Sequence, residues 1–203
     1  MEKFPILGRP GLDPAQRALW DELTLGPRGF YTGGAEAQRL PELYNAWLQF
    51  PEFGEVMLRL GDALRACTEL SGRHRELVVL TTSAMMGALV EFDFHVPFAR
   101  EQGLADEAIA AIREGAIPDL ANDADRIVFE ANVQLLRTSR LDPGLREAAI
   151  AALGHRGLMQ LIAAITLYAA TAWTTNVARV QLAEDFSADP GELSDFFAGR
   201  TPG

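Results

Sequence analysis

Apolar residues along this chain recur at the three- and four-residue spacing of helices, and the alternation typical of strands is nearly absent. In one segment this spacing places Val56, Met57, Leu60 and Leu64 on a common helix face. The longest candidate for a strand, residues 77–82, continues directly into a stretch rich in Ala and Met. Because Ala, Leu, Glu and Arg dominate elsewhere and favour helix, the pattern predicts an all-α fold.

Capping residues and prolines predict where the helices begin. Asp13–Pro14 and Asp142–Pro143 each combine an N-cap residue with a proline at the first helical position. Gly103 predicts the end of one helix, and Gly154 and Gly157 predict a turn between two others. The helices are expected to begin near residues 14, 41, 51, 73, 106, 123, 143, 157 and 190.

Glycine and proline interrupt residues 26–34, and no other stretch has the composition of a linker. We therefore expect residues 1–35 to form an N-terminal arm and residues 36–203 to form a single helical domain. No internal repeat or low-complexity segment divides that domain further.

Residues 157–178 carry no charge, and a helix of this length could span a bilayer. The segment nevertheless contains polar side chains that protein surroundings accommodate more readily than lipid does. We interpret it as a helix enclosed by other helices or by a subunit interface, and we expect no membrane association. Its polar residues are Gln160, Thr166, Tyr168, Thr171, Thr174, Thr175 and Asn176.

Charge and cysteine content narrow the range of functions. The chain has 18 Lys and Arg against 28 Asp and Glu, which gives a formal net charge of −10. Nucleic acids and anionic membrane surfaces bind basic patches, so the balance argues against both as partners. Cys67 is the only cysteine and cannot form an internal disulfide. With no apolar signal segment at the N-terminus, these features favour a cytoplasmic protein.

The residues best suited to catalysis lie at the two ends of an uncharged stretch, residues 77–90. Glu91 and His95 are four residues apart and share a face if the segment is helical. Glu76 lies 19 residues before His95, about 28 Å away on a straight helix. A helical hairpin that turns at residues 85–88 would bring all three together at an accessible hollow. Two carboxylates beside an imidazole suit general acid/base catalysis.

Other interpretations of these residues stay open. An exposed Glu–His pair at this spacing is commonly a surface interaction. A metal site formed by Glu91, Asp93 and His95 is less favoured, because Asp93 points off the shared face and only one imidazole is close in sequence. We therefore expect no metal and no cofactor. His74 lies between two arginines and is expected to be solvated.

This stretch resembles the carboxymuconolactone decarboxylase-like family, which belongs to the alkyl hydroperoxidase D-like superfamily. The resemblance is clearest from residue 41 to residue 115, and it implies an all-helical, homo-oligomeric protein (dimer, trimer or hexamer) that acts on a small-molecule substrate. The residues that carry it are Arg75-Glu76-Leu77, the Ala/Met-rich segment, Glu91-Phe92-Asp93-Phe94-His95, Ala99 and Gly103-Leu104.

The chain departs from the redox members of that family. Their Cys-X-X-Cys pair would fall at positions 88 and 91, where this sequence has Ala88 and Glu91. The thiolate is the nucleophile of thiol peroxidases, so peroxidase activity is not expected from this motif. For this branch, the resemblance implies decarboxylase-like lyase or isomerase chemistry on a carboxylate or lactone, with His95 as acid/base, Glu91 as its orienter and Glu76 as a further partner.

Four further residues are candidates for substrate binding: Trp47, Tyr168, Arg75 and Asn176. Trp47, Tyr168 and Asn176 each join an apolar body to a polar group. Arg75 could offset the repulsion between a substrate carboxylate and the two glutamates. Two alternatives remain. One is a peroxidase-like antioxidant protein that uses Cys67, and the other is a non-catalytic helical oligomer or ligand-binding module on the same scaffold.

Overall fold

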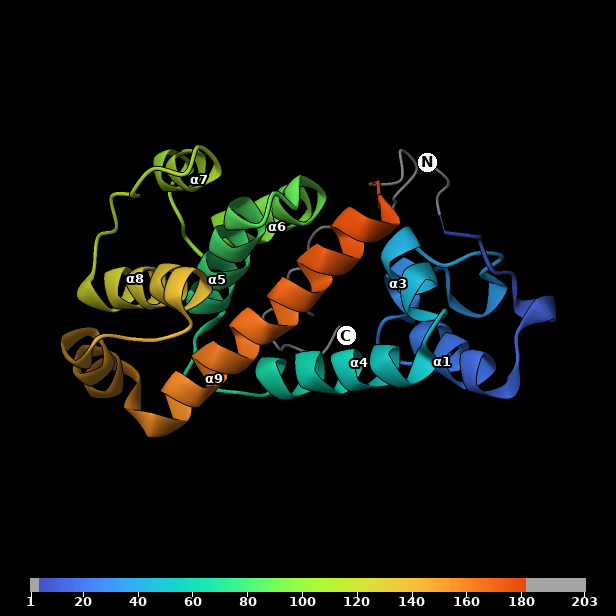
Figure 1. Cartoon of the computed structure of the whole chain (residues 1–203). Helices are drawn as coiled ribbons and strands as arrows, with labels where there is room; N and C mark the ends of the chain where they lie inside the picture. The colour runs from blue at the N-terminus through green and yellow to red at the C-terminus, as the bar shows by residue number, and fades with distance from the viewer. Residues whose placement is uncertain (1–3, 182–203) are drawn as a thin grey trace.

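The computed structural model describes residues 4–181, and every regular element in that range is a helix. The helix predicted to begin near residue 190 lies outside the described residues. Figure 1 shows the arrangement of the helices. Their bounds are α1 Pro14–Leu25, α2 Gly29–Thr32, α3 Glu42–Trp47, α4 Pro51–Arg65, α5 Gly72–Met85, α6 Leu89–Glu101, α7 Asp106–Arg113, α8 Asp123–Thr138 and α9 Pro143–Ala178, with short 3-10 turns η1 Arg9–Gly11 and η2 Gly34–Glu36.

Helix α5 lies at the centre of the molecule. It packs against α6, α7, α8 and α9, and residues 75–83 are buried on every side. A helix that is enclosed all round has no exposed polar face, and α5 accordingly carries four successive apolar residues, Leu77, Val78, Val79 and Leu80, all fully buried. The apolar side chains of α5 are part of a core to which most of the other helices also contribute.

The predicted capping residues begin their helices. The Asp13 side chain accepts a hydrogen bond from the Gln16 backbone N–H, and the Gln16 side chain accepts one from Asp13 in return. The Asp142 side chain accepts from the Leu145 N–H at the start of α9. These bonds satisfy amide groups that have no partner within the first helical turn.

The predicted hairpin is confirmed. Helix α5 ends at Met85, α6 begins at Leu89, and the two helices pack side by side. Gly87 in the turn has φ of +66°, a conformation that glycine adopts without steric penalty. The Ala88 N–H then donates to the Ser83 carbonyl at 2.8 Å, which closes the turn.

Helix α9 runs diagonally across the other helices (Figure 1) and contacts α3, α4, α5, α6 and α8. It is kinked at Gly154, whose φ is +70° and ψ is 172°, close to the predicted turn. Among residues 4–181 it is the one helix long and apolar enough to cross a membrane, and 44% of its most apolar window is buried inside the protein. Its contacts with five other helices are those of a core helix.

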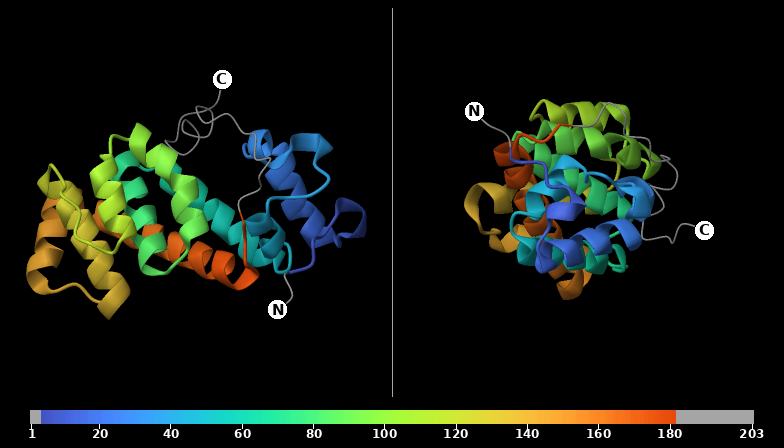
Figure 2. Two further views of the ribbon diagram at one scale, coloured as in Figure 1. Left: turned by 90° about the horizontal axis from the view of Figure 1, so that it is seen from above. Right: turned by 90° about the vertical axis from the view of Figure 1, so that its right-hand side faces the viewer.

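The N-terminal residues lie at one end of the molecule, and α7, α8 and the start of α9 lie at the other (Figure 2). Leu19, Trp20 and Leu23 of α1 are buried in the same apolar core as α5. Arg28, just before α2, donates to Asp62 of α4 at 2.7 Å and to the Leu58 carbonyl at 3.4 Å. The first helix is therefore attached to the rest of the chain by both apolar packing and polar contacts.

One expectation about a buried face was wrong. Val56 is exposed, because α4 turns Met57, Leu58 and Leu64 inward and leaves Val56 on another side. On α9, Trp173 is 63% exposed. A pattern of apolar positions fixes the period of a helix but does not fix which side another helix covers.

Candidate active site

The hairpin brings the imidazole of His95 between two carboxylates. Nδ1 of His95 on α6 lies 2.9 Å from Oε2 of Glu76 on α5, and Nε2 lies 3.4 Å from Oε1 of Glu91, one turn earlier on α6. His95 is 2% exposed, and both glutamates are buried. The convergence of these three residues, which the sequence spacing predicts, is confirmed.

The two carboxylates control the protonation of His95. Burial alone would lower the pKa of His95, but the charge and hydrogen bond of Glu76, followed by those of Glu91, raise its pKa to about 10. At neutral pH the ring is therefore an imidazolium that can donate from both nitrogens. In this state His95 is a proton donor rather than a base.

Aromatic rings enclose the imidazole. Phe94, Phe98 and Tyr168 each meet the His95 ring edge to face, with ring centroids 5.4, 5.6 and 5.7 Å away. Burial, together with the charges of Glu76 and Glu91, raises the pKa of Tyr168, so its hydroxyl stays protonated. Apolar walls of this kind strengthen the electrostatic interactions between the groups inside them.

Of the predicted substrate-binding residues, the structure brings Tyr168 directly to His95. Arg75 is buried and donates to the carbonyls of Leu70 at 3.1 Å and Leu64 at 3.4 Å, while its charge lowers the pKa of Tyr168. Arg75 therefore lies near the site, held by backbone oxygens at the end of α4 and in the loop that follows.

The other two predicted substrate-binding residues lie elsewhere. Asn176 donates to the Met86 carbonyl at 2.9 Å, so it lies at the hairpin turn, and the structure does not bring it to His95. Trp47 is buried against Tyr44, with ring centroids 5.4 Å apart. Its indole N–H is buried and has no hydrogen-bond acceptor within the described part of the chain.

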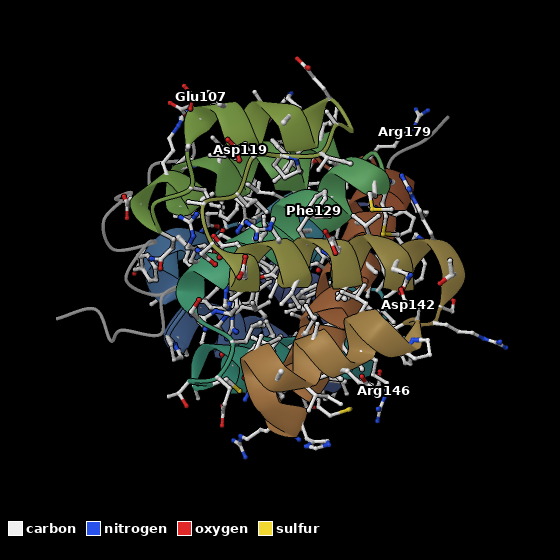
Figure 3. All side chains as sticks on the ribbon, turned by 90° about the vertical axis from the view of Figure 1, so that its left-hand side faces the viewer. Glu107, Asp119, Phe129, Asp142, Arg146 and Arg179 are labelled. Atoms are coloured by element: carbon white, nitrogen blue, oxygen red, sulfur yellow. The ribbon has the colours of Figure 1, made fainter. Side chains whose placement is uncertain are left out.

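Two hollows in the molecule do not open onto His95. A cleft of about 640 Å³ between α6 and α7 is lined by residues such as Asp93, Val96 and Arg113, on the side of α6 opposite His95. A second hollow of about 800 Å³ lies among α5, α7, α8 and the start of α9 (Figure 3, where Phe129 and Asp142 are labelled). Neither of them is the accessible hollow predicted at His95. The side chains of Glu76, Glu91 and His95 meet in the interior of the protein.

Two further side chains close in sequence to the site, Asp93 and His74, form ion-pair contacts away from His95. Asp93 pairs with Arg113 on α7, away from the imidazole, as its predicted position off the shared face indicates. His74 is not solvated as expected, because its Nε2 lies 3.3 Å from the buried Asp125 carboxylate. Within residues 4–181, no group of three or more His, Cys, Asp and Glu side chains is arranged to hold a metal ion.

A second polar cluster, which the sequence did not predict, lies beside the site. It consists of Arg28, Asp62 and Arg65, with the tyrosine pair Tyr31 and Tyr44, whose hydroxyl oxygens lie 2.6 Å apart. Tyr31 packs with Phe94 and Phe98, the same two rings that flank His95. Asp62 and Arg65 are three residues apart on α4, but Arg28, Tyr31 and Tyr44 come from other parts of the chain, and only the tertiary fold brings them to this pair.

Residues 51–131, which contain Glu76, Glu91 and His95, match the model of the carboxymuconolactone decarboxylase family. This segment belongs to that family. Comparison with curated protein sequences gave no match. The predicted family resemblance is confirmed for the carboxymuconolactone decarboxylase segment.

A solved structure extends the likeness to the whole fold. It is described as an alkylhydroperoxidase AhpD core, an uncharacterized peroxidase-related protein from Ralstonia eutropha JMP134. The two chains share 16% identity with a TM-score of 0.71, covering 99% of this chain and 97% of the other. At this identity the likeness shows the fold alone, and it confirms the predicted all-α, alkyl hydroperoxidase D-like architecture around the decarboxylase-family segment.

Proposed function

We propose that this protein is a decarboxylase-like lyase that acts on a lactone bearing a carboxylate, with His95 as the proton donor and without redox cysteines. The observation that supports the proposal is the buried imidazole of His95 held between the carboxylates of Glu76 and Glu91, which raise its pKa. A buried group that is protonated at neutral pH and fixed in orientation has the properties of a general acid.

In the proposed reaction, the carbon–carbon bond to the substrate carboxylate breaks and carbon dioxide leaves. The electron pair of that bond moves into the conjugated lactone carbonyl and forms an enolate. His95 then donates a proton to carbon, which gives the enol-lactone, and water returns a proton to His95. The two glutamates hold the ring in place and stabilise its positive charge.

The chain's own residues argue against a thiol mechanism. Ala88 and Glu91 occupy the positions of the cysteine pair of redox relatives. Cys67 follows the end of α4, where its thiol contacts the Ala63 carbonyl at 3.0 Å. Peroxide reduction is the alternative that the description of the Ralstonia eutropha relative raises, and it would require Cys67 as the nucleophile.

The test is release of carbon dioxide from carboxymuconolactone by the purified protein. We expect His95→Gln to lower kcat by at least about 100-fold, the size typical of a lost general acid, while the variant keeps its helical circular dichroism. Cys67→Ser is the matched control and should keep full activity. No turnover by the wild-type protein, or peroxide reduction that Cys67→Ser abolishes, would overturn the proposal.

A further inference from the structure

We infer that the second hollow, which lies among α5, α7, α8 and the start of α9, binds a small apolar carboxylate. The charged group of this ligand would lie at Arg137, and its hydrocarbon part would fill the hollow. The site is separate from His95, and the inference goes beyond the proposed function. A volume of about 800 Å³ lies within the range of pockets that hold small organic ligands.

The wall of the second hollow is mostly apolar. Ile112 of α7, Phe129 of α8 and Leu145 of α9 line it, and the first two are buried. Thr81 of α5 also lines it, but the Thr81 hydroxyl donates to the Leu77 carbonyl at 2.7 Å within the same helix. A hydrocarbon chain in this space would therefore remove apolar surface from water without leaving that hydroxyl unpaired.

Arg137 brings an unpaired cation to this hollow. It lines the hollow from the last turn of α8, and it is exposed. Among residues 4–181, its guanidinium has no ion-pair partner and no hydrogen-bond acceptor. By contrast, Arg100, Arg113 and Arg126 each pair with an aspartate. A ligand carboxylate would give Arg137 the charged, two-point hydrogen bonding that suits a guanidinium group.

Asp142 also lines the hollow, but its carboxylate is already engaged. It accepts hydrogen bonds from the Leu145 N–H at 2.9 Å and from the Gln134 side-chain amide at 2.8 Å. These bonds lower the pKa of Asp142. The N-terminus of α9, which Asp142 caps, adds a positive partial charge beside it. The repulsion between Asp142 and a bound carboxylate is therefore partly compensated.

Glu130 gives the hollow a direction. It lines the hollow from the same face of α8 as Arg137 and lies seven residues earlier, about 10 Å along the helix axis. Within the described part of the chain, the Glu130 carboxylate has no cationic partner. A bound carboxylate is attracted to the Arg137 end and repelled from the Glu130 end. Val133, between the two, offers apolar contact to the hydrocarbon part.

The competing occupant of the hollow is another copy of the chain. Figure 3 shows the side of the molecule on which Phe129 and Asp142 lie, and Ile117, which also lines the hollow, is 87% exposed. A subunit could cover an apolar surface of this kind. A subunit that buried Arg137 would have to supply a carboxylate to it, whereas a small ligand brings its own. The unpaired cation therefore favours a small carboxylate over a second copy.

The experiment compares octanoate, 1-octanol and octylamine by isothermal titration calorimetry. The three probes share one hydrocarbon chain and carry a negative, a neutral and a positive head group. We expect the wild-type protein to bind octanoate and to bind 1-octanol and octylamine at least about 10-fold more weakly, because only the carboxylate forms charged hydrogen bonds with the guanidinium. Arg137→Gln should reduce the affinity for octanoate to that for 1-octanol.

Two further variants test the two parts of the site separately. Ala148→Phe adds a ring to the lining of the hollow and should weaken octanoate and 1-octanol alike by at least about 10-fold. Arg140→Gln is the matched control for Arg137→Gln, because Arg140 is exposed and does not line the hollow, and it should bind as the wild type does. Circular dichroism checks the folding of each variant. Arg137 is exposed, so the test of the charged group stands even if Ala148→Phe does not fold.

The outcomes separate this inference from the proposed function. Octanoate could bind at His95 instead, so His95→Gln is titrated as well. Octanoate binding that persists in His95→Gln and is weakened in Arg137→Gln supports the inference even if carboxymuconolactone is not turned over. Binding that His95→Gln abolishes, or that Arg137→Gln leaves unchanged, would overturn it. Equal affinity for octylamine, no octanoate binding up to about 10 mM, or an oligomer that Ala148→Phe converts to a monomer in light scattering would also overturn it.

Discussion

At the scale of single residues, His95 links the chemistry of the site to the stability of the fold. The pKa of His95 is raised to about 10 in the folded protein, against about 6.5 for an unperturbed histidine. A group whose pKa rises on folding stabilises the protein fully below its unfolded pKa, and that stabilisation is lost as the pH rises through the folded value. The relevant window therefore lies between about pH 6.5 and about pH 10.

We predict that the free energy of unfolding falls across this window by an amount on the order of a few kcal/mol. Urea denaturation at several pH values measures it. His95→Gln lacks the titrating group and should show a shallower decline, which separates the contribution of His95 from that of every other titrating group. Parallel declines in the two proteins would contradict the assignment of this effect to His95.

The two glutamates are expected to contribute unequally. Glu76 lies 2.9 Å from the ring and Glu91 lies 3.4 Å from it, and the charge of Glu76 is the largest influence that raises the pKa of His95. Glu76→Gln should therefore lower the pKa of His95 more than Glu91→Gln does. Nuclear magnetic resonance titration of the His95 ring measures both shifts, and Asp93→Asn, which removes a carboxylate paired with Arg113, should leave the value unchanged.

Sequence reasoning at this scale found His95, Glu76 and Glu91 because chain spacing carries their relationship. Two of them are one helical turn apart, and the third follows from a single turn in the chain. It did not find the cluster of Arg28, Asp62 and Arg65, because Arg28 lies 34 residues before Asp62 with no periodic relation, although Arg65 is only three residues from Asp62. It also placed His74 in solvent, since its buried partner Asp125 is distant in sequence.

At the scale of elements, the α5–α6 hairpin is the feature that assembles the site. The turn uses Gly87 at φ of +66°, where a Cβ would meet no neighbouring atom. Gly87→Ala should therefore destabilise the fold by about 1 kcal/mol through backbone strain alone.

Chemical denaturation measures this difference. Gly11→Ala is the matched control, because a Cβ there also meets open space and Gly11 has no left-handed φ. The control should change stability by only a few tenths of a kcal/mol. A Gly87→Ala variant as stable as the control would show that the turn tolerates an ordinary residue.

The hairpin could be predicted from two features of the sequence. Residues 85–88 lie midway between Glu76 and His95, and this segment contains Gly87, which can end a helix. The orientation of α4 could not be predicted, because Val56 and Met57 are both apolar and only packing against neighbouring helices such as α1 and α9 decides which is buried. Local signals specify where helices start and turn, whereas neighbours specify which face each helix buries.

At the scale of the whole molecule, α9 leaves an apolar face uncovered. Met159, Trp173 and Val177 lie on one side of this helix and are exposed, on a segment with no charged residue from 157 to 178. Exposed apolar stripes of this kind are typical of contacts between subunits. We predict that the protein forms a homo-oligomer through this face.

Trp173→Glu should shift the protein toward the monomer, because a carboxylate in an apolar contact loses its hydration without a partner. Light scattering coupled to size-exclusion chromatography measures the mass. Ile117→Glu, at an 87% exposed apolar residue between α7 and α8, is the control and should leave the mass unchanged. An oligomer that survives Trp173→Glu unchanged would place the contact elsewhere.

The position of His95 between two carboxylates has one more consequence. A histidine coordinates a transition metal through a ring lone pair, and in the imidazolium both lone pairs are occupied by protons. At pH 7, a metal ion would have to displace a proton from this ring before it could bind, because Glu76 and Glu91 raise the pKa of His95. The arrangement that favours proton donation by His95 therefore disfavours its use as a metal ligand.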